Sequence, residues 1–334
     1  MVLPRYGGRL EDQPDSVSSV PVVKGPSIAV IDIGSNSIKV LVASRAPDGR
    51  VTALATRTID ARISAGIGHA PPRLTPEGMA RGLDAIRTLL AEAAPFAPTA
   101  TVLVATSAVR DAQNGADFRE LVRAATGQTI RILTGDEEAN LIGRGLTCDP
   151  ALAALRDFYV LDLGGGSLEC LAFHDRHIQQ AASLQLGCVR LTEKFVPDPA
   201  RPLAGDATKR ITAHIRDVLT KSNFAFSFSP AAVAVGTGGT LTTVRTIAAA
   251  KAGPALEQTS TSITVTQLRE LLASLGALPL AERKKIPGLP PARADVFPAA
   301  LVTLITLAEI GGFDAYRHSL FNLRYGLADE ALAR

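Results

Sequence analysis

Residues 31–43 read IDIGSNSIKVLVA, and residues 161–173 read LDLGGGSLECLAF. Each stretch has an apolar run with an aspartate near its end, then a turn of glycine and small polar residues, then a second apolar run. Short apolar runs of this kind are typical of buried strands. One pattern at two places in the chain indicates an internal duplication of an α/β domain. The cleft between two such halves is a natural position for a ligand.

The segments around each stretch predict the further strands and helices of an α/β domain. Thr75 before Pro76 is a typical helix start, and Asp48-Gly49 is a typical hairpin turn. Residues 1–26 are rich in turn formers and lack periodicity, which predicts a flexible tail. In the first half we expect strands at 27–33, 37–44, 51–58, 101–106 and 130–133, and helices at 76–93, 116–126 and 136–144. In the second half we expect strands at 157–163, 168–173, 177–185 and 231–235, and helices near 191–196, 205–221, 239–250, 266–274, 279–285, 291–311 and 320–332.

Composition narrows the class of protein. A length of 334 residues is ample for two domains, and a hydrophobic content of 46% excludes a disordered chain. The chain has 35 basic and 32 acidic residues and no tryptophan, so neither a strong positive field nor aromatic stacking favours a nucleic-acid partner. It has no signal-like apolar segment near the N-terminus and no apolar run of the ~18 residues that span a bilayer. With three widely spaced cysteines, this predicts a soluble, cytoplasmic protein with reduced thiols and no membrane partner.

The first turn carries Asp32, Gly34, Ser35, Asn36 and Ser37. Glycine lets the backbone approach a ligand closely, and successive N–H groups with Ser and Asn side chains form an anion-binding concavity. A carboxylate at the strand end repels a phosphate unless a cation lies between them, which indicates Mg²⁺ bound by Asp32. The alternative is an ordinary hairpin turn with a solvated aspartate.

The second turn contains three consecutive glycines, which cost conformational entropy and favour a role in backbone–ligand contact. Asp162 precedes this turn and Glu169 lies on the outgoing strand, so both can converge with Asp32 on one metal ion or its waters. The candidate phosphate-binding residues of the second turn are Gly164, Gly165, Gly166 and Ser167.

A third glycine-rich turn, GTGGT at 236–240, follows a predicted strand and opens a predicted helix. The free N–H groups and the dipole of a helix N-terminus favour a phosphate at such a place. A plain connection between strand and helix is the alternative. The candidate phosphate-binding residues here are Gly236, Gly238, Gly239 and Thr240.

Charged residues outside the turns are candidates for catalysis. Arg110 follows a buried strand, where a guanidinium can bind phosphate in a bidentate manner, and a surface pair with Asp111 is the alternative. Glu137 and Glu138 open a helix, where the helix dipole favours acids. Helix capping is a sufficient explanation for Glu137, whereas Glu138 can point into the cleft as a general base for water.

Seven motifs occur in one order between residues 28 and 327: IDIGSNSIK, ATSAVRDAQN, ILTGDEEANLIGRG, VLDLGGGSLE, SLQLG, VGTGGT and IPGLPPARADVFPAAL. Together they resemble the exopolyphosphatase/guanosine pentaphosphatase (Ppx/GppA) family of the actin/Hsp70/sugar-kinase superfamily. The resemblance implies two ribonuclease-H-like (actin-like ATPase) α/β domains with an interdomain cleft. It also implies hydrolysis of a terminal phosphoanhydride with Mg²⁺ or Mn²⁺. The expected substrate is inorganic polyphosphate, and guanosine pentaphosphate is the alternative.

The resemblance further implies roles for single residues. Glu138 matches the catalytic base of the family, and Arg110 matches its phosphate-binding arginine. Asp162 and Glu169 match the acids that position metal and water, so the implied metal ligands are Asp32, Asp162 and Glu169. The first and second turns match the two phosphate loops of the family.

The resemblance also suggests a division of the chain. We expect domain I at 27–147 plus 315–334 and domain II at 148–314, because the last helix of the family packs back on the first domain. The length of the chain matches that of the short, two-domain members of the family. A homodimer is one of the oligomeric states that the sequence leaves open. Leu168, Lys39 and the C-terminal FNLRYGLADEAL depart from the usual residues of the family without removing a proposed catalytic group. A superfamily phosphotransferase and a non-catalytic polyphosphate or alarmone sensor are the remaining interpretations.

Overall fold

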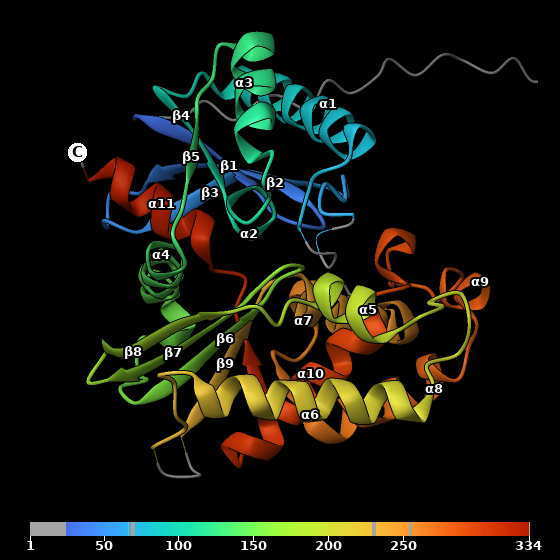
Figure 1. Ribbon diagram of the computed structural model, residues 1–334. Coiled ribbons are helices and arrows are strands. Elements are labelled where there is room, and N and C mark those ends of the chain that lie inside the picture. Colours follow the sequence, from blue (N-terminus) through green and yellow to red (C-terminus); the bar gives the residue numbers. More distant parts are fainter. Residues whose placement is uncertain (1–24, 66, 68–70, 229–231, 254–255, 334) are drawn as a thin grey trace, which may run out of the picture.

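The computed structural model describes residues 25–65, 67, 71–228, 232–253 and 256–333. The predicted flexible tail at 1–26 lies outside the described residues up to position 24. The described chain is an α/β structure with two β-sheets, each with its own helices (Figure 1).

The first sheet has the strand order β3-β2-β1-β4-β5, in which β1, β2 and β3 are antiparallel while β4 and β5 run parallel to β1. Helix α1 begins as predicted, because the Thr75 side chain accepts a hydrogen bond from the Gly78 N–H and Pro76 occupies the first turn. Phe118 from α3 packs with α1 against the sheet. The elements are β1 (Ser27–Ile33), β2 (Ile38–Arg45), β3 (Val51–Ile59), α1 (Pro76–Ala93), η1 (Ala94–Phe96), β4 (Ala100–Ala105), α2 (Ser107–Arg110), α3 (Gly115–Thr126), β5 (Ile130–Ile132) and α4 (Gly135–Thr147).

The second sheet repeats this arrangement. Its order is β8-β7-β6-β9-β11-β10, with β6, β7 and β8 antiparallel and with β9 and β11 parallel to β6. The shared pattern confirms the predicted duplication of a ribonuclease-H-like unit. The elements are η2 (Pro150–Leu152), β6 (Phe158–Leu163), β7 (Leu168–His174), β8 (His177–Leu184), α5 (Cys188–Phe195), α6 (Gly205–Lys221), β9 (Val233–Thr237), α7 (Gly239–Ala252), η3 (Leu256–Gln258), β10 (Ser262–Thr264), α8 (Val265–Gly276), α9 (Leu280–Arg283), η4 (Pro291–Arg293), α10 (Phe297–Gly311) and β11 (Ala315–His318).

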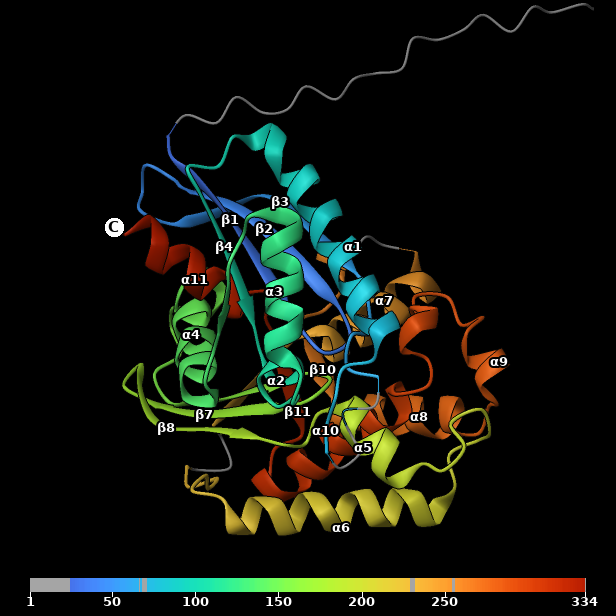
Figure 2. The ribbon, with the colours of Figure 1, turned by 45° about the horizontal axis from the view of Figure 1, so that its top comes forward.

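Helices α4 and α11 (Leu323–Leu332) lie side by side between the two sheets (Figures 1 and 2). The last helix was expected to pack on the first half, and in the structure α11 contacts α4, β1 and β2. Helix α4 also packs on β7 and β8 of the second sheet. These two helices share one hydrophobic core with both sheets, built from residues such as Ile28, Leu41, Ile142, Leu171 and Leu327.

The sequence prediction was wrong at several elements. It missed the short α2 and the strands β10 and β11, and it extended one helix over 291–296, where the chain forms a 3₁₀ turn before α10. Strand β11 pairs with β9 and β10, so residues 315–318 belong to the second sheet and not to domain I. Only the helix that follows β11 returns to the first half. The reason is that a four-residue strand is too short to leave a clear alternation of apolar and polar residues.

In the described part of the chain, no helix is long and apolar enough to cross a membrane. Cys148, Cys170 and Cys188 are free thiols, as predicted.

Candidate functional site

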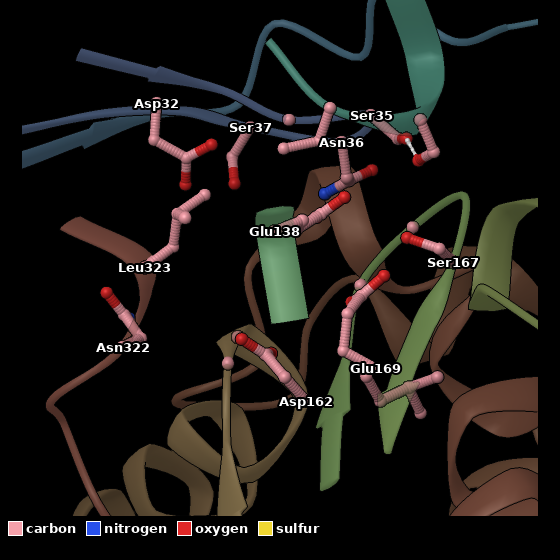
Figure 3. A pocket seen from close by; sticks show the side chains of 18 of the residues that line it. Asp32, Ser35, Asn36, Ser37, Glu138, Asp162, Ser167, Glu169, Asn322 and Leu323 are labelled. Atoms are coloured by element: carbon pink, nitrogen blue, oxygen red, sulfur yellow. Dashed lines mark hydrogen bonds between the residues drawn. The ribbon is translucent and has the colours of Figure 1, made fainter. Parts of the chain in front are cut away.

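A cavity lies where the two duplicated turns meet, and Figure 3 shows its side chains. Asp32 points into it from the first sheet, whereas Asp162 and Glu169 point into it from the second sheet (Figure 3). Glu138 reaches it from the first turn of α4. The lining residues are Asp32, Gly34, Ser35, Asn36, Ser37, Lys39, Thr106, Ser107, Glu138, Ile142, Asp162, Leu163, Gly164, Gly165, Ser167, Glu169, Gly238, Gly239, Arg293, Asn322 and Leu323.

The first and second turns have the same backbone hydrogen bond. The Gly34 N–H donates to the Ser37 carbonyl at 3.2 Å, and the Gly164 N–H donates to the Ser167 carbonyl at 3.0 Å. Each turn therefore closes a hairpin in the same way, and each puts its strand-end aspartate beside the cavity. This local geometry agrees with the duplication that the sequence predicted.

The glycines of the second turn are required by packing between the halves. A Cβ atom on Gly165 would lie 2.8 Å from Ser35 Cβ, and one on Gly166 would collide with the Ser107 hydroxyl. The hydroxyls of Ser35 and Ser107 are themselves 3.3 Å apart (Figure 3). From the sequence, contact with a ligand was the only role predicted for these glycines. The structure adds that the second turn must also fit against the first half.

Asn36 is buried, with an exposed fraction of 3%, and lines the cavity. Neither its amide nitrogen nor its amide oxygen has a hydrogen-bond partner among the described residues. Figure 3 shows this amide directed toward Glu138. Because a buried amide without partners is costly, Asn36 indicates a polar ligand in the cavity.

Burial and mutual repulsion raise the pKa values of the acids from the second sheet. Burial raises the pKa of Asp162 to about 6, with Lys39 opposing the rise and Asp32 adding to it. Burial and the charge of Asp162 raise the pKa of Glu169 to about 7, and the hydroxyls of Ser167 and Ser183 oppose this rise. The Ser183 hydroxyl donates to Glu169 Oε1 at 2.9 Å. Gathered carboxylates of this kind favour a cation or a proton between them.

Glu138 is also buried, and its partner is Arg110. Glu138 Oε2 accepts from Arg110 Nη1 at 2.9 Å, while the same nitrogen donates to the Leu133 carbonyl at 3.0 Å. Burial raises the pKa of Glu138 well above its ordinary value of 4.5, the charge of Glu169 adds to this, and Arg110 opposes it. Glu137 instead caps α4, because it exchanges hydrogen bonds with Thr134, as the sequence indicated.

The third turn contributes only two of its four candidates to the cavity, Gly238 and Gly239. Gly238 has a positive φ of 90°, and a Cβ atom there would collide with Asp162 Oδ1. The predicted Gly236 and Thr240 face the protein interior instead, Gly236 against Leu241 and Thr240 in a buried position. The two middle candidates of this turn thus line the cavity while the first and the last face the interior, which the motif alone does not reveal.

Two other candidates lie just outside the cavity lining. Arg110 contacts Glu138 and Asp111, so in this structure it is engaged with carboxylates rather than open to a phosphate. The Gly166 carbonyl accepts from Arg190 Nε at 3.0 Å. The ion pair between Arg110 and Asp111, which was the alternative interpretation of Arg110, is present in the structure, with 3.3 Å between Arg110 Nε and Asp111 Oδ1.

No role in the site was predicted from the sequence for five polar residues that line the cavity: Lys39, Thr106, Ser107, Arg293 and Asn322. Thr106 and Ser107 belong to the ATSAVRDAQN motif and Arg293 belongs to the IPGLPPARADVFPAAL motif, so the motifs carried a signal for these three residues. Arg293 and Asn322 come from distant segments. The Arg293 guanidinium lies against Gly239 at the start of α7, where a Cβ atom would collide with it. A cation at a helix N-terminus is electrostatically unfavourable unless an anion joins it.

The predicted ligands for Mg²⁺, namely Asp32, Asp162 and Glu169, line one cavity. They do not form a metal centre by themselves, since the described chain has no group of three His, Cys, Asp or Glu side chains arranged to hold a metal ion. Asp32 and Asp162 both interact with the charge of Lys39. Oxygen donors from opposite sheets suit Mg²⁺ held by one or two carboxylates, with waters and substrate oxygens completing the shell. The donor set thus fits a shared metal–substrate site and does not fit an all-protein cage.

Comparisons with known proteins agree with this geometry. The model of the Ppx/GppA phosphatase family matches residues 41–334. The structure resembles an exopolyphosphatase from Cytophaga hutchinsonii with a TM-score of 0.80 and 23% identity over 92% of this chain and 98% of that chain. It also resembles the Aquifex aeolicus PPX-GPPA enzyme with a TM-score of 0.72 and 24% identity over 91% of this chain and 99% of that chain. The fold is therefore that of Ppx/GppA proteins.

Proposed function

The chain belongs to the Ppx/GppA phosphatase family, and we propose that it is an exopolyphosphatase, which releases the terminal phosphate of inorganic polyphosphate by hydrolysis. The observation that carries this proposal is the position of Glu138. Its carboxylate lies in the same cavity as both glycine turns and has a raised pKa. A buried carboxylate beside a phosphate site is suited to accept a proton from water.

In the proposed complex, the terminal phosphate lies between the two turns. Around the place where its oxygens fit lie the Asn36 amide, the hydroxyls of Ser37 and Ser167, and the N–H groups of both turns other than those of Gly34 and Gly164, which donate within their own turns. Arg293 beside the first residue of α7 supplies positive charge. Phosphoryl transfer depends mainly on positioning and charge stabilisation, which such a set of donors provides.

Glu138 orients a water molecule and removes its proton during in-line attack on the terminal phosphorus. Arg110 holds Glu138 through its hydrogen bond and balances charge next to the phosphate. Asp32, Asp162 and Glu169 are the residues that would hold Mg²⁺ or Mn²⁺. When bound, such an ion neutralises phosphate charge and stabilises the leaving group.

The test is phosphate release from long-chain polyphosphate with Mg²⁺, measured for the wild type and for Glu138→Gln. Because a general base contributes ~10²–10⁴-fold in rate, kcat should fall by about that factor while polyphosphate still binds. Chelation of the metal should abolish release by the wild type.

Near-normal turnover of Glu138→Gln would refute the base assignment. Polyphosphate binding without phosphate release by the wild type would favour a sensor, and transfer that requires an acceptor would favour a phosphotransferase.

A second candidate is guanosine pentaphosphate 5′-phosphatase. A larger cavity of about 510 Å³ adjoins the site and shares with it Ser37, Lys39, Gly238, Gly239, Arg293 and Asn322. Its walls add Arg57 and Arg324, which suit a continuing polyanion, and also Leu320 and Tyr325, whose apolar surfaces suit a nucleobase. The ratio of kcat/KM for long-chain polyphosphate to that for guanosine pentaphosphate decides between the two substrates.

A further inference from the structure

Arg190 connects the two halves at the edge of the cavity. It comes from α5 of the second half, and its guanidinium is mostly buried, with 13% of the side chain exposed. Its Nε donates to the Gly166 carbonyl at 3.0 Å, within the second glycine turn. Its Nη2 forms an ion pair of 2.7 Å with Asp111 Oδ2, which belongs to the first half.

Asp111 passes this contact on toward the proposed base. Its other carboxylate oxygen, Oδ1, accepts from Arg110 Nε at 3.3 Å. Arg110 Nη1 in turn donates to Glu138 Oε2 at 2.9 Å. The charges therefore alternate along one line, Arg190 to Asp111 to Arg110 to Glu138, and we call this line the relay. The two outer links, at 2.7 and 2.9 Å, are short charge-assisted hydrogen bonds, which are stronger than neutral ones, and the Arg110–Asp111 link of 3.3 Å is the longest of the three.

We infer that Arg190 is a positioning residue, which orients Glu138 through the relay and makes that orientation depend on contact between the halves. This inference rests on the proposed role of Glu138 as the base. Arg190 does not line the cavity and contacts Asp111 and the Gly166 carbonyl rather than Glu138, so its influence on Glu138 passes through Asp111 and Arg110. The second half thus contributes to the base that the first half carries.

The physical reason is the division of Asp111 between two cations. With Arg190 present, one Asp111 oxygen faces each guanidinium, and Arg110 is free to direct Nη1 at Glu138. Without Arg190, Asp111 has Arg110 as its remaining cation in the relay, and Arg110 turns toward it and away from Glu138. A base displaced by about 1 Å can lose on the order of 10²-fold in rate.

A matched control is offered by another ion pair between the halves. Arg62 Nη1 lies 2.6 Å from Asp295 Oδ2, joining the segment after β3 to the segment before α10. This pair shares no residue with the relay. Asp295→Asn therefore weakens contact between the halves while it leaves the relay unchanged.

The experiment measures kcat and KM on long-chain polyphosphate for Arg190→Ala, Arg190→Lys, Asp111→Asn, Arg190→Ala/Asp111→Asn and Asp295→Asn. We expect Arg190→Ala to lower kcat about ten- to a hundredfold while KM changes less than about threefold. Arg190→Lys should recover part of kcat, because the charge is kept but the fork is lost. The double variant should lose no more than the worse single variant, because both act through one contact. Asp295→Asn should keep kcat within about twofold.

Equal losses of kcat in Asp295→Asn and Arg190→Ala would overturn the inference, since Arg190 would then only hold the halves together. A loss confined to KM would overturn it as well, since Arg190 would then act on the phosphate turn through Gly166. Glu138→Gln in parallel separates these failures from a failure of the proposed function.

A second readout does not depend on turnover. Amide hydrogen exchange over 107–111 and 134–138 should become faster in Arg190→Ala and stay unchanged in Asp295→Asn. Unchanged exchange in Arg190→Ala would show that the relay does not hold these segments, whatever the substrate of the enzyme.

Discussion

Asn36 keeps both polar atoms of its amide buried and without a partner among the described residues. In the ligand-free protein, such an amide lowers the free energy of unfolding by roughly 1–3 kcal/mol. A bound phosphate, or the water that attacks this phosphate, can form the missing hydrogen bonds and so recover that loss. Stability and ligand binding therefore make opposite demands on this position. Evolution of a binding site commonly accepts such a cost.

We predict that Asn36→Ala raises KM for polyphosphate at least tenfold and leaves the free energy of unfolding of the ligand-free protein within about 1 kcal/mol of the wild type. The matched control is Asn114→Ala. Asn114 is similarly buried, and its amide exchanges two hydrogen bonds of 2.9 Å with the Leu74 backbone. The control should lose about 2 kcal/mol in urea denaturation. An equal loss in both variants would show that Asn36 is a structural residue.

Glu138 makes activity depend on pH. Since burial raises the pKa of Glu138 and a base must be deprotonated, kcat/KM should rise with pH along a limb that lies well above 4.5. The neighbouring, half-exposed Glu137 provides the control, because the Thr134 backbone and Arg131 hold the pKa of Glu137 below its ordinary value. Glu137→Gln should leave the limb in place. A limb near pH 4.5 in the wild type would contradict the environment described for Glu138.

At the scale of elements, α4 is held in place by close contact with α11. A Cβ atom on Gly326 would collide with the Leu141 carbonyl of α4, and one on Gly145 would collide with the Asn322 carbonyl. Because Glu138 lies in the first turn of α4, the fit between these helices sets the distance between the base and the phosphate turns.

We predict that Gly326→Ala lowers the free energy of unfolding by about 1–3 kcal/mol and also lowers kcat, because α4 must move to make room. Gly205→Ala is the control. Gly205 begins α6, and no described atom lies within 4 Å of a Cβ built there, so alanine should be neutral or stabilise the helix by up to ~1 kcal/mol. Chemical denaturation and polyphosphate turnover of both variants measure these effects. If Gly326→Ala is destabilised but keeps a normal kcat, the contact between α4 and α11 does not determine the position of the base, and the prediction is wrong.

Elements with local signals could be predicted from the sequence. The strands beside both turns, the start of α1 at Thr75 and the capping of α4 by Glu137 depend on neighbouring residues, and their positions agree with the structure. Arg293 and Asn322 could not be placed, because tertiary packing brings them to the cavity. Arg283 helps to fix the segment of Arg293, since its buried guanidinium donates to the carbonyls of Leu278, Ala294, Pro199 and Arg201. The spacing of these residues in the sequence does not indicate that one guanidinium binds all four carbonyls.

At the scale of the whole molecule, stability depends on a histidine that stays neutral. His318 of β11 is buried, and its Nδ1 accepts from Arg245 Nη1 at 3.1 Å. Burial and the charge of Arg245 lower the pKa of His318 from 6.5 to about 3. In the unfolded chain the imidazole binds a proton below 6.5, so folding loses stability as the pH falls from 6.5 toward 3.

At pH 5 the contribution of His318 alone is a loss of about 2 kcal/mol relative to pH 7, from about 1.5 pH units below the unfolded pKa. The raised pKa values of Asp162 and Glu169 act in the opposite direction over the same range. The contribution of His318 is therefore measured as the difference between the wild type and His318→Gln in urea denaturation at both pH values. His318→Gln, which can still accept from Arg245, should show a smaller pH-dependent loss by about that amount. Identical pH dependence in the two proteins would mean that His318 is protonated in the folded state.

The position of α11 between the sheets has a consequence for synthesis. Ile28 and Leu41 share a core with Leu323 and Leu327, although the whole second half is translated between them. At ~5–20 residues per second, the roughly 280 residues from β2 to α11 take about 15–55 s to make. During that time the face of the first sheet that α11 covers is exposed on the nascent chain. The first half therefore completes its fold only after α11 has left the ribosome, and until then it offers an apolar face to chaperones.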